Sequence, residues 1–123
     1  MRFEEQDGFS AWGLPRLAVK AELLIDGYKQ WTKENTLYAV HGEIATFVSP
    51  HMAVHVEIID HDFYQMKVEV QATHNGSLLY DGKTFLVHAG TEEDRTCYFL
   101  HENQGHTKEE FYVTLRVLLP DKE

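Results

Sequence analysis

Hydrophobic and polar residues alternate along most of this chain, which is the period-two pattern of a β-strand with one buried face. Residues 50–61, with the sequence PHMAVHVEIIDH, give a clear case. One register of this segment is apolar and comprises Met52, Val54, Val56 and Ile58. The other register is polar and includes His51, His55, Glu57 and His61. The pattern predicts a strand whose apolar register belongs to the core.

The same alternation continues to residue 119 and is interrupted by turn residues. The last apolar register is the most regular and comprises Phe111, Val113, Leu115, Val117 and Leu119. Asn75-Gly76 is the strongest hairpin signal, because both central residues of a type I′ turn need a positive φ. Residues 102–110 are polar and are predicted to form a loop. We therefore expect an antiparallel β meander over 36–119.

Residues 14–31 fit two patterns. Their apolar positions follow helical spacing, with Pro15 in the first turn and Gly27 after the last. Alternate positions from Leu17 to Ile25 are also apolar, and Asp26-Gly27 would then be a hairpin turn. The Ala, Leu, Lys and Glu content favours a helix. We expect a helix over 14–31 that packs on the sheet, with the hairpin as the alternative.

The size and composition of the chain suit a single domain, residues 1–123. Hydrophobic residues make up 43% and aromatic residues 12%, which is enough for a core without disulfides. Residues 1–13 form an N-terminal arm that carries Phe3, Phe9 and Trp12, and it docks on the body or on another chain. The predicted fold class is mainly β, an antiparallel sandwich or half-open barrel of six to seven strands with one N-terminal helix.

The formal net charge of −9, from 11 basic and 20 acidic residues, changes the range of partners. Binding to a nucleic-acid backbone or an anionic membrane needs concentrated Lys and Arg, so neither is expected. A protein partner with a basic surface is expected instead. The acidic run Glu92-Glu93-Asp94 and the arm residue Trp12 are candidate binding residues.

Cys97 is the single cysteine, which excludes an internal disulfide and a cysteine-based zinc site. The first residues lack the basic and apolar regions of a signal peptide, and no stretch is long enough to cross a bilayer. We therefore expect a cytoplasmic protein.

A histidine followed two positions later by a glutamate occurs twice. His55 and Glu57 share one strand face, and His41 and Glu43 repeat the spacing one strand earlier. Residues two apart on a strand point the same way, about 7 Å apart. His55 and Glu57 would form a metal site if a neighbouring strand brought a third ligand, and the two pairs would form one if they faced each other.

A solvated strand face is the simpler interpretation of these histidines. His51 and His55 are about 13 Å apart on a regular strand, too far to share one zinc ion. In one register His55 and Glu57 would instead meet Glu69 and Lys67 across a hairpin. We expect no metal and no cofactor, and we retain His41, Glu43, His55 and Glu57 as candidate binding residues.

No segment carries a nucleophile elbow or a phosphate-binding loop, so no catalytic residue is predicted. The leading hypothesis is a non-enzymatic acidic binding protein, an inhibitor or regulatory subunit that acts on another macromolecule. One alternative is a small-molecule-binding β pocket or small enzyme. Another is a structural subunit of a larger assembly, which would form homo-oligomers.

Overall fold

The computed structural model describes residues 16–38, 43–61, 65–74, 77–78, 83–88, 94–102 and 107–118. These residues form strands and turns only, and no helix among them is long and apolar enough to cross a membrane. The strands are β1 (Arg16–Ile25), β2 (Tyr28–Tyr38), β3 (Ile44–Val48), β4 (Ala53–His61), β5 (Gln65–His74), β6 (Ser77–Leu78), β7 (Lys83–His88), β8 (Arg95–Glu102) and β9 (Lys108–Leu118). The prediction of a mainly β sandwich is confirmed.

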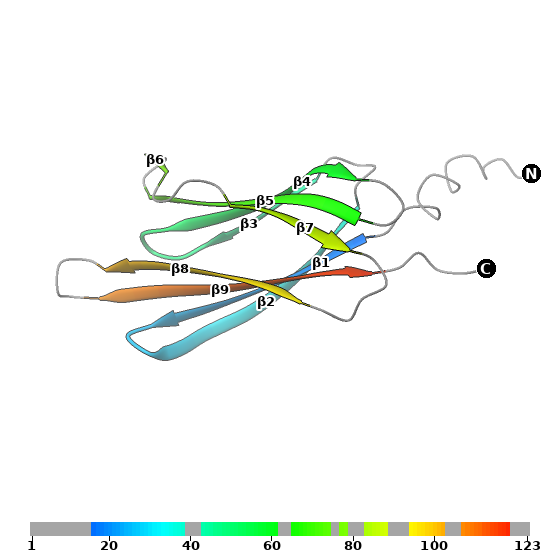
Figure 1. The fold of residues 1–123 in the computed structure, drawn as a ribbon. Helices are drawn as coiled ribbons and strands as arrows, with labels where there is room; N and C mark the ends of the chain where they lie inside the picture. The colour runs from blue at the N-terminus through cyan, green and yellow to red at the C-terminus, as the bar shows by residue number, and fades with distance from the viewer. Residues whose placement is uncertain are drawn as a thin grey trace, which may run out of the picture.

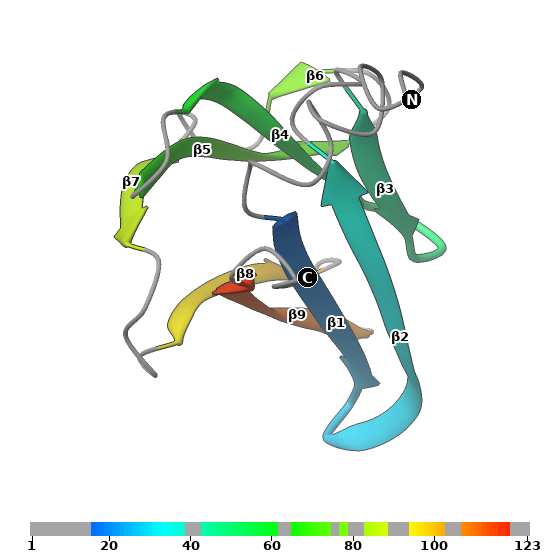
Figure 2. The same cartoon turned by 90° about the vertical axis from the view of Figure 1, so that its right-hand side faces the viewer.

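The strands form two antiparallel sheets that lie face to face (Figure 1). The first sheet has the order β2-β1-β9-β8, so the first two strands of the chain lie beside the last two. The second sheet has the order β3-β4-β5-β6, and β7 also pairs with β5. Figure 2 shows the hairpin of β1 and β2 extending beyond the second sheet. The described strands number nine, more than the six to seven predicted.

The predicted helix over 14–31 is wrong in its described part, because β1 and β2 occupy residues 16–25 and 28–38. Asp26 and Gly27 have φ values of 52° and 85°, so the turn between the strands needs a left-handed conformation at both positions. The inward register of β1 is buried and comprises Leu17, Val19, Ala21 and Leu23. Packing of this register against the other sheet overrides the helix propensity of the segment.

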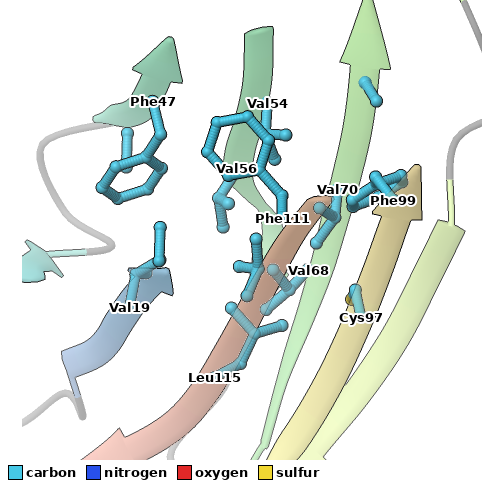
Figure 3. Close-up of a cluster of buried hydrophobic side chains, with 14 of the residues drawn as sticks. Val19, Phe47, Val54, Val56, Val68, Val70, Cys97, Phe99, Phe111 and Leu115 are labelled. Atoms are coloured by element: carbon cyan, nitrogen blue, oxygen red, sulfur yellow. The ribbon is translucent and has the colours of Figure 1, made fainter. Parts of the chain in front are cut away.

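The core fills the space between the two sheets. Figure 3 shows Phe99 and Phe111 pointing into this space, together with Val54, Val56 and Val70 from the second sheet. All five side chains are at most 1% exposed. Burial of each contributes about 1.5–3 kcal/mol, so this layer is the main source of stability.

The predicted apolar registers of two strands are confirmed. Met52 precedes β4 and is 2% exposed, and Val54 and Val56 are fully buried. On β9 the buried register comprises Phe111, Val113, Leu115 and Val117. Leu119 and the predicted turn Asn75-Gly76 lie outside the described residues.

Candidate functional site

The structure brings only some of the predicted binding residues together. His55 and Glu57 lie on β4. The Oε1 atom of Glu43 accepts a hydrogen bond of 3.1 Å from the backbone N–H of Tyr38, where the two sheets approach each other. His41, Glu92, Glu93 and the arm of residues 1–13 with Trp12 lie outside the described residues.

Asp94 is held by Arg116 on the first sheet. The Arg116 Nε atom donates to Asp94 Oδ1 at 2.6 Å, and a second guanidinium nitrogen lies 3.3 Å from Oδ2. This carboxylate is on a different sheet from His55 and Glu57. Asp94 is therefore not part of a site with those two residues.

The solvent-facing side of β3, β4 and β5 is the first candidate surface, and we call it the outer face. Its residues alternate with buried ones along each strand. Its solvent-facing residues include Ile44, Thr46, Val48, His55, Glu57, Glu69 and Thr73.

His55 lies between two threonine hydroxyl groups on the outer face. Its Nδ1 atom is 3.2 Å from Thr46 Oγ1 on β3, and its Nε2 atom is 3.3 Å from Thr73 Oγ1 on β5. Both ring nitrogens are therefore engaged by neighbouring strands. In the described part of the chain, no group of three or more His, Cys, Asp or Glu side chains is placed to hold a metal ion.

The pairing predicted for His55 and Glu57 across the hairpin is wrong. The register of β4 and β5 places His55 opposite Gln71 and Glu57 opposite Glu69. Lys67 lies opposite Asp60, beyond a register shift after Ile58. The alternation of residues fixes the face on which each side chain lies, but it fixes neither the register between the two strands nor the shift after Ile58.

Glu57 and Glu69 are therefore like charges in directly opposite positions. Residues opposite each other on antiparallel strands have Cβ atoms about 4.5–5.5 Å apart, and like charges there destabilise the sheet. Both residues are half-buried, and neither forms an ion pair with a described residue. The outer face thus holds two opposed carboxylates that form no ion pair with a described residue.

Three carboxylates on the solvent side of the other sheet have partners. Three contacts show this: Glu22 with Lys29 at 3.2 Å, Asp94 with Arg116 at 2.6 Å, and Glu110 with the Tyr98 hydroxyl at 2.5 Å. Glu57 and Glu69 differ from these three carboxylates, because they lie opposite each other and form no ion pair with a described residue.

A second cluster joins the two sheets, and we call Ser49, His51 and Glu109 the inter-sheet clasp. Glu109 lies on β9 and is only 1% exposed. Its Oε1 atom accepts hydrogen bonds from Ser49 Oγ at 2.5 Å and from the His51 backbone N–H at 3.2 Å. Its Oε2 atom lies 2.5 Å from His51 Nδ1. Ser49 also contacts Met52, its Oγ lying 3.1 Å from both the backbone O and N–H.

The clasp alters the acidity of Glu109. Burial raises the pKa of this carboxyl group, but the hydrogen bonds from Ser49 and His51 and the charge of His51 lower it by more. The net effect is a pKa below the usual value for glutamate. Glu109 is therefore held as a carboxylate inside the sandwich.

Two further imidazoles lie beside the clasp. The ring centroid of His101 is 5.9 Å from that of His51 and 4.5 Å from that of His74. A carboxylate bound to Nδ1 of a partly exposed histidine is the arrangement that orients a general base. Here the Ser49 hydroxyl bonds to the carboxylate and not to the imidazole, so His51 does not activate Ser49 as a nucleophile. Its geometry fits a connection between the sheets.

The sequence pattern did not point to Glu109, because residues 102–110 were expected to be a loop. Instead β8 extends to Glu102 and β9 begins at Lys108. Glu109 is two positions before Phe111 and so belongs to the inward register of β9. Extending the alternation backwards by one step would have identified an inward carboxylate.

A shallow groove of about 270 Å³ crosses the solvent side of the first sheet. Small side chains form its floor, including Ala18, Thr36 and Thr114, and charged Glu34 and Arg116 line it. Small-molecule sites enclose about 300–1,000 Å³ and are mostly apolar. The groove is smaller and more polar than such a site.

Comparison with protein-family models, with curated proteins and with solved structures finds no match for this chain.

Proposed function

We propose that this protein is a non-enzymatic binding protein whose outer face receives a basic surface of a protein partner. The observation that carries the proposal is the carboxylate pair of Glu57 and Glu69. The pair costs stability in the isolated chain. A Lys or Arg side chain of the partner beside this pair offsets the repulsion with a favourable interaction.

Exposed aliphatic side chains beside the carboxylates support the same proposal. Ile44 is 54% exposed and Val48 is 62% exposed on β3. Ile44 lies opposite Glu57, so apolar and charged groups are directly adjacent. Protein interfaces combine an apolar centre with charged groups that set orientation and partner choice. The net charge of −9 would also attract a basic partner over long range.

Stability measurements test the first part of this proposal. Glu57→Gln and Glu69→Gln, made singly, remove the repulsion and are expected to raise the free energy of unfolding by about 0.2–1 kcal/mol. Urea unfolding at low salt measures the gain, which should shrink when salt screens the charges. Glu34→Gln on β2 is the matched control and should give no gain. A loss of stability in both test variants would show that the two carboxylates do not repel each other.

Binding measurements test the second part. Proteins from the native host retained on the immobilised chain at low salt are quantified for the wild type, for Glu57→Gln/Glu69→Gln and for Glu34→Gln. We expect basic proteins to be retained by the wild type and the control, and to be lost with the double variant or at high salt. Equal retention by all three proteins would exclude the outer face as the binding surface.

A further inference from the structure

The two sheets differ in how their edge strands are protected. β2 is the edge of the first sheet and carries three charged residues, Lys29, Lys33 and Glu34. Charged side chains, especially Lys, keep other chains from pairing with an edge. β3 is the edge of the second sheet, and its sequence IATFV has no charged residue. In the described chain β3 pairs with β4 only, and the end of β2 approaches just before its first residue.

We infer that β3 accepts an extended segment of the partner as an additional antiparallel strand. This inference rests on the proposed function and states how the outer face recognises its partner. An edge strand presents unpaired N–H and C=O groups, and pairing with them gives affinity that does not depend on sequence. Side chains on the two faces of the added strand then give specificity.

The register of the sheet defines the side chains that such a segment needs. Ile44 is in one row with Glu57 and Glu69, whereas Val48 is in one row with Ala53 and Thr73. The added strand therefore meets a carboxylate row at Ile44 and an uncharged row at Val48. The matching segment has an aliphatic residue next to Val48 and, four positions later, a Lys or Arg next to Ile44.

Strand spacing separates the roles of the two glutamates. Neighbouring strands lie about 4.8 Å apart, so the added strand is about 10 Å from β4 and about 14 Å from β5. A long basic side chain together with the Glu57 side chain can bridge the shorter separation. The separation of about 14 Å between the added strand and β5 is too long for the same side chain to contact Glu69 directly. Glu57 is therefore the direct partner of the basic residue, and Glu69 attracts that residue electrostatically without contacting it.

Charge complementarity excludes two other occupants of the β3 edge. A second copy of the chain is equally acidic, with a net charge of −9, and its own β3 has no basic residue to offer Glu57. Residues 1–15 of the same chain contain one arginine against three acidic residues. A basic segment of a different protein satisfies the carboxylates better than either.

The test uses the full chain and the peptide acetyl-Thr-Val-Val-Thr-Val-Lys-Thr-amide, with binding followed by amide NMR shifts and hydrogen exchange. We expect shifts on the outer face and slower exchange of the β3 amides. Glu57→Gln should weaken binding about threefold to fivefold, as for a partly exposed ion pair. Glu69→Gln should weaken it less than twofold, and Glu34→Gln should have no effect.

Two control peptides separate strand addition from charge attraction. A peptide with Glu in place of Lys should bind more weakly than the Lys peptide does to Glu57→Gln, and one with N-methylated backbone nitrogens on its β3 side should lose most of its affinity. Equal binding of the N-methylated peptide would overturn strand addition and leave the proposed function standing. No shift at millimolar peptide would overturn the inference. Protection of β3 that grows with protein concentration alone would make a second copy the occupant, and would overturn it as well.

Discussion

At the scale of single residues, the inter-sheet clasp shows how a buried carboxylate is accommodated. Moving a carboxylate out of water is expensive unless hydrogen bonds replace its hydration. Glu109 receives them from Ser49 Oγ, His51 N–H and His51 Nδ1. Ser49 and His51 lie in the connection from β3 to β4, whereas Glu109 lies on β9. One side chain therefore ties the second sheet to the first.

Glu109→Gln should destabilise the protein, because a neutral amide accepts weaker hydrogen bonds than the carboxylate. The expected loss is about 1–3 kcal/mol at neutral pH, the range for hydrogen bonds to a charged group. Glu110→Gln is the matched control: this neighbouring residue faces solvent beside Tyr98, so its loss should be within about 0.5 kcal/mol. Urea unfolding of both variants measures the difference, and equal losses would mean that Glu109 has no special role.

The clasp also predicts the sign of a pH dependence. The pKa of Glu109 is lowered in the folded chain, so its stabilising contribution is fully present above the unfolded value of about 4.3. The contribution decreases as pH falls below that value towards the folded pKa. The stability difference between the wild type and Glu109→Gln should therefore shrink between about pH 5 and pH 3. A difference that stays constant over this range would contradict a lowered pKa.

At the scale of elements, the alternation of residues predicted which side of each strand is buried, because that pattern depends only on side chains two positions apart. It predicted neither the opposition of Glu57 and Glu69 nor the inward position of Glu109. The first depends on the register between β4 and β5, which the alternation does not fix. The second was missed because the start of β9 was expected to be a loop. Residues 16–25 show the same limit, because helical spacing and alternation coexist there and only packing against β9 decides between them.

The turn between β1 and β2 offers a test of whether residues 16–25 form a strand and not a helix. Its turn residue Asp26 donates a backbone hydrogen bond of 2.8 Å to the Lys108 carbonyl, and its Oδ1 accepts one of 2.9 Å from Lys108 N–H. Gly27 has a φ of 85°, and a Cβ there would meet no atom within 4 Å. Gly27→Ala should thus cost about 1 kcal/mol through backbone strain alone.

Asp26→Asn is the control for this turn, since Asn adopts positive φ and keeps the side-chain oxygen that faces Lys108. Its stability should remain within about 0.5 kcal/mol of the wild type. Thermal unfolding of both variants measures the contrast. An unchanged midpoint for Gly27→Ala would argue against a left-handed turn at this position and reopen the helical alternative.

At the scale of the whole molecule, the apolar layer and the inter-sheet clasp both hold the two sheets of the sandwich together. The core brings together strands from both sheets, and its buried residues include Phe99 and Phe111 from the first sheet and Val54 and Val70 from the second. The clasp joins the same two sheets through Glu109. Loss of the clasp should therefore increase opening of the whole layer and not only local motion of the β3–β4 connection.

Cys97 reports such opening, because it is the single cysteine and is only 2% exposed within the core. A thiol reagent should label the folded wild type slowly and the urea-unfolded chain at once. If labelling follows global opening, Glu109→Gln should accelerate it about tenfold for each 1.4 kcal/mol of stability lost. Labelling rates measured in native buffer give this factor independently of urea. Fast labelling of the wild type, or equal rates in both proteins, would show that Cys97 becomes accessible through a local motion that the clasp does not control.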